Sequence, residues 1–189
     1  MTHLAGLPEL GPVLHDRDAI AHRVAALGTA ISTDFAGRVP VLIAVLKGAA
    51  VFAADLTRAM TIEHELDFLA VSAPGDGATA AQAQITKDVQ VPIQGRPVIL
   101  IEDVVDTGLT VRFISRWLHT HEPASIDVVT LLDRPHRRII DEPVRYSGFI
   151  VPDTFLVGYG FDYQQQYRHL ADLHELDLGL DERERLLSS

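Results

Sequence analysis

Three acidic residues stand between an apolar run and a turn of small and hydroxyl residues. The run at residues 98–101 leads into Glu102, Asp103 and Asp106, and residues 107–110 continue as Thr-Gly-Leu-Thr. A turn of this kind at the start of a helix offers several backbone N–H groups to one anion, and the helix dipole adds to the attraction. We therefore expect residues 107–110 to bind a phosphate group.

The acids before this turn need a different partner, because a carboxylate and a phosphate repel one another. Glu102 and Asp103 could meet sugar hydroxyls or Mg²⁺, a cation that proteins hold with carboxylates and substrate phosphates. A phosphate at one end and vicinal hydroxyls at the other describe a ribose 5-phosphate. The spacing of a Walker loop is absent. The alternative interpretation is a strand that ends in solvated acids, with Thr107 and Gly108 serving only to begin a helix.

The segments that must position these residues alternate between strands and helices. Apolar runs predict strands at residues 39–46, 63–72, 97–102 and 125–132, with shorter strands near 83–90, 147–152 and 155–160. Helical spacing of apolar residues predicts a first helix after Asp16, its expected N-cap, and further helices at 47–60 and 108–121. This order predicts an α/β fold with a mainly parallel sheet flanked by helices.

Parallel sheets of this kind bind ligands beyond the carboxyl ends of their strands. Three polar clusters follow predicted strands, namely Lys47-Gly48, residues 102–110 and Asp133-Arg134-Pro135. We expect these clusters to meet in one site. Residues 73–84 are small and polar, with two glycines and a proline, and are expected to form a mobile functional loop.

Composition narrows the class of protein. A chain of 189 residues suits one domain, and the absence of cysteine excludes disulfides and Cys-ligated metals. The net charge of −10 argues against nucleic-acid binding. No apolar run approaches the roughly 20 residues of a membrane-spanning helix, and the first residues lack the pattern of a signal peptide. We expect a cytoplasmic protein that does not bind membranes.

The motif ILIEDVVDTGLT at residues 99–110 resembles the phosphoribosyl-pyrophosphate (PRPP) signature of type I phosphoribosyltransferases. Four further segments resemble the hypoxanthine-guanine subfamily in the same order and at similar spacing. They are VLKGAAVFAADL (45–56), LDFLAVS (66–72), TLLDRP (130–135) and VPDTFLVGYGFDYQQQYRHL (151–170). The resemblance covers roughly residues 15–175, and VGYGFDYxxxYR is its most specific part.

The resemblance implies the type I phosphoribosyltransferase fold with a small hood subdomain. Residues 1–189 would form a single domain, with a core at about 37–150 and a hood from the N-terminal segment and about 151–189. It also implies an enzyme of purine salvage that is a homodimer or homotetramer. Its reaction is the Mg²⁺-dependent transfer of the phosphoribosyl group from PRPP to N9 of hypoxanthine or guanine, which yields IMP or GMP and pyrophosphate.

The same resemblance assigns roles to individual residues. Asp106 would be the general base for the purine N7 proton, which requires that it lie near N7 and hold no fixed cation. In the PRPP site, Lys47 and Gly48 would form the pyrophosphate loop, which the family precedes with a non-proline cis peptide, and Arg168 would also contact the pyrophosphate. Glu102 and Asp103 would meet the ribose and Mg²⁺. The 5-phosphate would be held by Thr107, Gly108, Leu109 and Thr110. Phe155 and Val104 would pack on the two purine faces, Leu156 would offer backbone groups to the base, and Asp162 would line the purine site and be a second Mg²⁺ contact.

Two segments depart from the family pattern. Arg134 stands where the family has a lysine that donates to purine O6. Its guanidinium can address O6 and N7 together, which keeps the preference for 6-oxopurines. The catalytic loop reads Ser-Ala-Pro-Gly at residues 72–75 instead of Ser-Ser-Tyr-Gly, so we expect weaker closure over PRPP. Two alternatives stay open: a PRPP- or nucleotide-sensing regulator with little turnover, and a phosphoribosyltransferase for a different purine.

Overall fold

A six-stranded sheet forms the centre of the molecule. The computed structural model describes residues 8–72 and 83–178, so the expected mobile loop lies almost entirely outside the described residues. The strand order is β4-β3-β2-β5-β6-β7, and only β4 runs antiparallel to its neighbour. The strands are β2 (Val41–Leu46), β3 (Glu65–Ser72), β4 (Gln84–Lys87), β5 (Pro97–Val105), β6 (Ser125–Asp133) and β7 (Tyr146–Ile150). The mainly parallel sheet expected from the sequence is confirmed.

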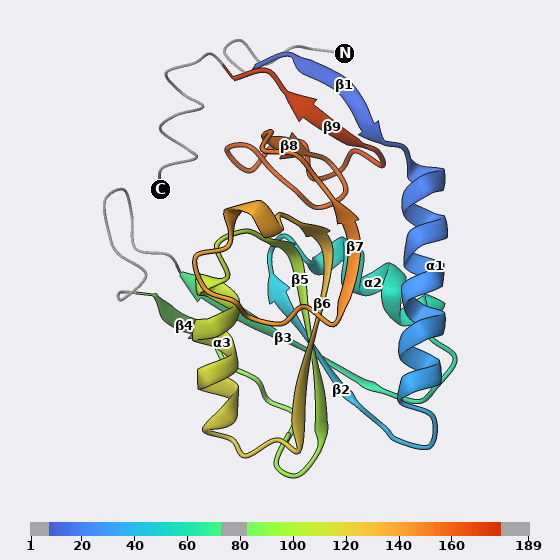
Figure 1. Cartoon of the computed structure of the whole chain (residues 1–189), viewed down its shortest axis with the longest axis vertical. Coiled ribbons are helices and arrows are strands. Elements are labelled where there is room, and N and C mark those ends of the chain that lie inside the picture. Colours follow the sequence, from blue (N-terminus) through green and yellow to red (C-terminus); the bar gives the residue numbers. More distant parts are fainter. Residues whose placement is uncertain (1–7, 73–82, 179–189) are drawn as a thin grey trace.

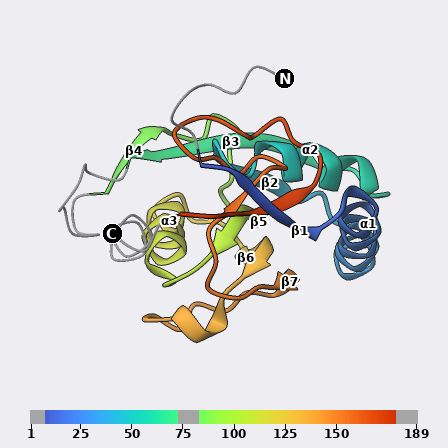
Figure 2. The same ribbon diagram turned by 90° about the horizontal axis from the view of Figure 1, so that it is seen from above.

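Helices cover both faces of this sheet (Figures 1 and 2). Side chains of β2 alternate between the two faces, because successive residues of a strand point to opposite sides. Leu42 and Ala44 pack in the core beneath α1 (Arg17–Asp34) and α2 (Ala50–Ala59). Val41 and Ile43 pack in the core beneath α3 (Leu109–His119). Both faces are therefore apolar, and polar ligands are left to the strand ends.

A second, smaller sheet lies above the carboxyl ends of the central strands (Figure 1). It is antiparallel and joins β1 (Leu10–His15), β9 (Leu173–Leu176) and β8 (Leu156–Val157) in that order. The sequence did not predict β1 or β9. The charged sequence from residue 172 onward would suggest a solvated helical tail, but that prediction is wrong for the described part, because residues 173–176 pair as a strand with both β1 and β8. Residues 179–189 lie outside the described residues.

Several element boundaries differ from those expected. The first helix begins where predicted, with the Asp16 carboxylate accepting the N–H of Ala19 at 2.8 Å. Strand β5 extends to Val105 rather than ending at Glu102, because its backbone goes on pairing with β6 beyond the apolar run. The strand expected at residues 155–160 stops at Val157, since Gly158 and Gly160 have positive φ angles.

A buried carboxylate fixes the connection between β4 and β5. The oxygens of Asp67 on β3 accept the N–H groups of Phe68, Gln90 and Val91, and lie 3.3 Å from Nζ of Lys87 at their closest. This group of contacts is called the Asp67 clamp. Next to it, the indole N–H of Trp117 on α3 donates to Asp88 at 2.9 Å.

Within residues 8–72 and 83–178, no helix is long and apolar enough to cross a membrane.

Candidate active site

A cavity of about 270 Å³ opens at the carboxyl end of β5. The strand, the turn after it and the first turn of α3 line the cavity. The lining residues are Glu102, Asp103, Val104, Val105, Asp106, Thr107, Gly108, Thr110 and Val111. The structure therefore brings most of the residues of the predicted PRPP motif into one space, and the predicted strand–turn–helix arrangement is confirmed.

The phosphate turn is held from behind by the segment after β6. The carbonyl oxygen of Thr107 accepts N–H groups from Ile139 and Ile140 at 3.0 and 3.1 Å. Gly108 has a φ of +83°, and a Cβ at this position would lie 2.5 Å from the carbonyl oxygen of Ile140. Only glycine fits this combination of backbone angle and close approach. The turn thus has a fixed shape before any anion arrives.

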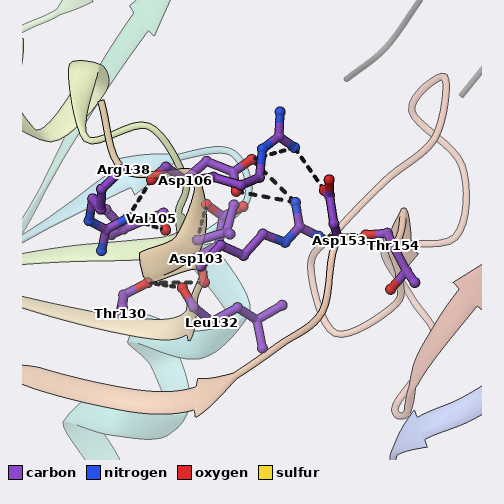
Figure 3. A network of polar contacts seen from close by, with 11 residues as sticks. Asp103, Val105, Asp106, Thr130, Leu132, Arg138, Asp153 and Thr154 are labelled. Atoms are coloured by element: carbon purple, nitrogen blue, oxygen red, sulfur yellow. Dashed lines mark hydrogen bonds and ion pairs between the residues drawn. The ribbon is translucent and has the colours of Figure 1, made fainter. Parts of the chain in front are cut away.

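Arg138 stabilises the same turn. Its Nη1 donates to the carbonyl oxygens of Val105 and Asp106, both at 2.5 Å, and its Nη2 donates to the carboxylate of Asp133, also at 2.5 Å. Figure 3 shows Arg138 joined to Val105 and Asp106 in this way. Arg138 therefore fixes the two carbonyl groups that directly precede the turn.

The two acids of β5 are buried and poorly neutralised. Glu102 is 4% exposed, and its Oε1 has no hydrogen-bond partner among the described residues. Burial, followed by the nearby charge of Asp103, raises the pKa of Glu102 well above its usual range. Burial also raises the pKa of Asp103 to about 6, although N–H groups including that of Val104 oppose this shift. Carboxylates left in this condition are suited to a cationic or hydroxyl-bearing ligand.

A hard cation fits this pair of carboxylates only with help from a ligand. Among the described residues, no group of three or more His, Asp or Glu side chains could hold a metal ion. Mg²⁺ is commonly held by one or two carboxylates, with phosphates and waters completing its shell. Glu102 and Asp103 fit that mode. Both oxygens of Asp162 already have partners, Arg168 at 2.5 Å and the N–H of Gln165 at 2.7 Å.

The pyrophosphate loop lies beside Asp103. The Leu46–Lys47 peptide is cis, as the resemblance implied. A Cβ on Gly48 would overlap the Asp103 carboxylate, so the loop needs glycine there. On the other side, a Cβ on Gly160 would lie 2.5 Å from the carbonyl oxygen of Gly48. The two glycines therefore let the loop fit between β5 and the segment that follows β8.

Two cations border this loop. Nζ of Lys47 donates to the side chain of Gln165 at 3.1 Å. Nη1 of Arg168 donates to the carbonyl oxygen of Gly160 at 2.6 Å. Lys47, Gly48, Asp162 and Arg168 come from segments more than 100 residues apart, and the structure brings them together. Sequence reasoning missed Gln165 and Gly160, whose residue types carry no chemical signal of their own.

Asp106 lies opposite two guanidinium groups. Nη1 of Arg134 is 3.3 and 3.2 Å from the two carboxylate oxygens, and Nη1 of Arg137 is 3.5 Å from one of them. In the ligand-free protein, the requirement that Asp106 hold no fixed cation is therefore not met. The arginines come from the turn after β6, where Pro135–Arg137 form the short 3-10 helix η2. Its residues directly follow a predicted strand end, and their repeated positive charge was the signal that could have indicated them.

Arg134 also reaches the segment that carries the expected purine contacts. It is 7% exposed, and its Nη2 donates to the carbonyl oxygen of Thr154 at 2.6 Å. Its Nε has no partner among the described residues, and neither has the buried hydroxyl of Thr154. Figure 3 shows Asp106, Asp153 and Thr154 in the resulting network. The Nε–H donor of Arg134 and the hydroxyl of Thr154 are thus unused by the protein's described residues.

Phe155, Leu156 and Val104 are less closely grouped than the sequence suggested. Phe155 is partly buried, and its ring packs edge-on against Tyr163 with centroids 5.9 Å apart. It borders a separate cavity of about 300 Å³ between β1 and residues 175–178. Leu156 is buried in the main core, whereas Val104 lines the first cavity. Arg134 connects the two regions through Asp106 and Thr154.

Comparison with known proteins identifies the family. The family model for the phosphoribosyl transferase domain matches residues 13–165. This chain belongs to the phosphoribosyltransferase family. The phosphoribosyltransferase is 42% identical over 166 residues to the hypoxanthine phosphoribosyltransferase of Salmonella typhimurium, a match that covers 86% of this chain and 93% of that protein. It is 36% identical over 163 residues to the hypoxanthine-guanine phosphoribosyltransferase of Streptococcus thermophilus, with 86% and 91% covered.

Solved structures agree with this assignment. A hypoxanthine-guanine phosphoribosyltransferase of Bacillus anthracis, crystallised with a HEPES molecule in its active site, superposes with a TM-score of 0.87 and 38% identity. The match covers 89% of this chain and all of that one. A hypoxanthine phosphoribosyltransferase of Staphylococcus aureus gives a TM-score of 0.85 at 36% identity, with 89% and 92% covered. The type I fold and the transferase activity expected from the sequence are confirmed for this phosphoribosyltransferase.

Proposed function

We propose that this phosphoribosyltransferase salvages 6-oxopurines, with hypoxanthine and guanine as its bases. The observation that carries this choice is the position of Arg134. Its buried guanidinium lies between Asp106 and Thr154 and keeps an unused N–H donor. A 6-oxopurine offers an acceptor at O6, whereas adenine has a donor at position 6. A buried donor without an acceptor is costly, so this pocket favours the oxopurines.

The proposed reaction joins purine N9 to C1 of the ribose. The C1–oxygen bond to pyrophosphate breaks, pyrophosphate leaves with the electron pair, and the N7 proton passes to Asp106. Because Arg134 contacts both oxygens of Asp106, a purine that accepts a hydrogen bond from Arg134 must draw it away before the proton can move. General-base help of this kind is typically worth about 10²–10⁴-fold.

The remaining roles are those that the family resemblance implies, and the charges around the cavity support them. Residues 107–110 would hold the 5-phosphate through backbone N–H groups and two hydroxyls. Lys47 and Arg168 would neutralise the departing pyrophosphate, where charge develops in the transition state. Glu102 and Asp103 would hold Mg²⁺, which would supply positive charge to neutralise the departing pyrophosphate. A further Mg²⁺ contact at Asp162, and the stacking of the base between Phe155 and Val104 against the backbone of Leu156, stay predictions.

We also propose that β1, β8 and β9 form the hood of a single domain that spans residues 1–189. Assembly as a homodimer or homotetramer and a cytoplasmic location stay predictions from the sequence. Light scattering on the purified protein would measure the number of subunits.

The decisive experiment for this function is product formation from PRPP and Mg²⁺ with each of hypoxanthine, guanine, xanthine and adenine, with pyrophosphate release followed in parallel. We expect nucleotide from hypoxanthine or guanine and none from adenine. Turnover of adenine would contradict the role of Arg134. Tight binding of PRPP without turnover of any base would instead support the regulator that the sequence left open.

A further inference from the structure

The two arginines that face Asp106 differ in their surroundings. Arg134 is buried and bonds to Thr154, so its guanidinium borders the space proposed for the base. The side chain of Arg137 is 19% exposed and lies on the outer side of the network. Its Nη1 is 3.5 Å from Asp106 and 3.2 Å from the Asp153 carboxylate. One cation thus faces the base, and the other bridges two acids.

This difference matters once a base enters the site. Proton transfer needs a free oxygen on Asp106, and the purine needs the N–H donors of Arg134. Both needs are met when Arg134 turns from Asp106 to the purine. Nη1 of Arg134, which contacts Asp106 at 3.2 and 3.3 Å, can turn to the purine while Nη2 keeps its 2.6 Å bond to Thr154. Asp106 would then keep only Arg137 of its two cations.

We propose that Arg137 is a positioning residue that holds the Asp106 carboxylate in place while Arg134 engages the purine. This inference rests on the proposed function. It assigns no contact with the substrate to Arg137, which acts through Asp106. A general base must lie within hydrogen-bond reach of the proton that it accepts, and small misplacements of a reacting group have large effects on rate.

The bridge to Asp153 gives this residue a second consequence. Asp153 follows β7 and directly precedes Thr154, which bonds to Arg134, and Phe155, which is expected to pack on the purine. Arg137 therefore links Asp106, the proposed general base, to the segment that would contact the purine. Movement of Asp153 when the purine binds would therefore be transmitted to Asp106 through Arg137, in addition to the link that Arg134 makes from Thr154.

The test uses the full-length enzyme and four variants. Arg137→Gln removes the charge, Arg137→Lys restores it, and Asp153→Asn removes only the outer acid. Arg112→Gln is the matched control, because Arg112 on α3 also pairs with a carboxylate, Glu142 at 3.1 Å, but does not border the cavity. For each protein, kcat and KM for hypoxanthine are measured at saturating PRPP, together with the Kd for PRPP and the midpoint of urea unfolding.

We expect Arg137→Gln to lower kcat about tenfold and to leave the PRPP Kd and the unfolding midpoint unchanged. Arg137→Lys should recover most of that loss, Asp153→Asn should show a smaller one, and Arg112→Gln should match the wild type. Wild-type kcat in Arg137→Gln would overturn the inference, as would a loss that accompanies weaker PRPP binding or lower stability. If the wild-type enzyme turned over no base, the proposed function would fail first, so the two failures can be told apart.

Discussion

Two buried acids on neighbouring regions of the same sheet have opposite environments. Asp67 on β3 is 7% exposed and accepts three backbone N–H groups beside Lys87. Burial alone would raise its pKa, but these hydrogen bonds outweigh burial and hold the pKa of Asp67 below its usual value. Glu102 on β5 is 4% exposed, keeps an oxygen without a partner among the described residues, and has a raised pKa.

The difference separates an acid that stabilises the fold from an acid that serves a ligand. A buried carboxylate is costly unless it is paired, so a chain that leaves one unpaired needs a compensating partner. For Asp67 that partner is the protein itself. For Glu102 the partner proposed here is the ribose and Mg²⁺ of the bound substrate. Four changes would break or sharpen this contrast.

The largest effect is expected from Glu102→Gln. We expect kcat/KM for PRPP to fall about 10²-fold, or about 2.7 kcal/mol, because a carboxylate contact with the ligand is lost. The free energy of unfolding should stay the same or rise, because a buried unpaired charge is removed. Steady-state kinetics and urea unfolding measure the two quantities. Lower stability with wild-type activity would make Glu102 a structural acid.

Asp67→Asn should have the reverse effect. The amide cannot accept the same three N–H groups as a carboxylate, and hydrogen bonds to charged groups contribute about 1.5–3 kcal/mol. We expect the free energy of unfolding to fall by about 2 kcal/mol. The activity of the remaining folded enzyme should stay within about twofold of wild type, because the clamp does not border the cavity. A specific loss of PRPP affinity would place Asp67 in the active site.

The two regions should also respond to pH in opposite directions. The folded pKa of Asp103 is about 6, above its unfolded value, so its contribution to stability is lost as pH rises toward 6. The lowered pKa of Asp67 makes its contribution present above the ordinary Asp pKa and lost as pH falls below it. One proton corresponds to at most about 1.4 kcal/mol per pH unit.

Urea unfolding of the ligand-free protein in a chelating buffer, from about pH 2.5 to about pH 7, measures these slopes. Subtracting the curve of Asp103→Asn should leave a contribution that falls with pH, and subtracting that of Asp67→Asn should leave one that rises. Parallel difference curves would show that the two acids do not differ in the way described.

Lys87→Met should have the smallest effect. The side chain of Lys87 is 38% exposed, and its 3.3 Å contact with Asp67 is one of several that the carboxylate makes. Exposed ion pairs contribute about 0–1 kcal/mol. We expect the free energy of unfolding to fall by less than about 1 kcal/mol. A loss as large as that of Asp67→Asn would mean that the cation, rather than the backbone N–H groups, stabilises the clamp.

Short stretches of sequence were enough to predict the elements whose structure depends mainly on neighbouring residues. The β5–turn–α3 unit combines an apolar run, a glycine and hydroxyl residues within 14 positions, so the sequence alone indicated both the elements and their phosphate chemistry. The capped first helix was predicted from Asp16 and the spacing of apolar residues for the same reason. The roles of Lys47 and Arg168 came only from the family resemblance, since an exposed cation has no local signature.

The missed features depend on contacts between distant segments. Strand β1 contains Gly11 and Pro12, which weaken a strand pattern, and its partner β9 lies about 160 residues away. The length of β5 beyond Glu102 is set by pairing with β6 rather than by side-chain type. The contact of Arg134 and Arg137 with Asp106 depends on how the turn after β6 folds back over the phosphate turn, which no single segment encodes.

The indole of Trp117 gives this enzyme a built-in optical probe. It is the only tryptophan of the 189-residue chain and is 37% exposed. Its N–H donates to Asp88, two residues before the first N–H of this connection that Asp67 accepts. Local opening of that segment would break this bond and bring the ring into a more aqueous environment, which shifts its emission. Fluorescence selective for tryptophan would therefore follow the β4–β5 connection without any label, at residues that do not line the cavity.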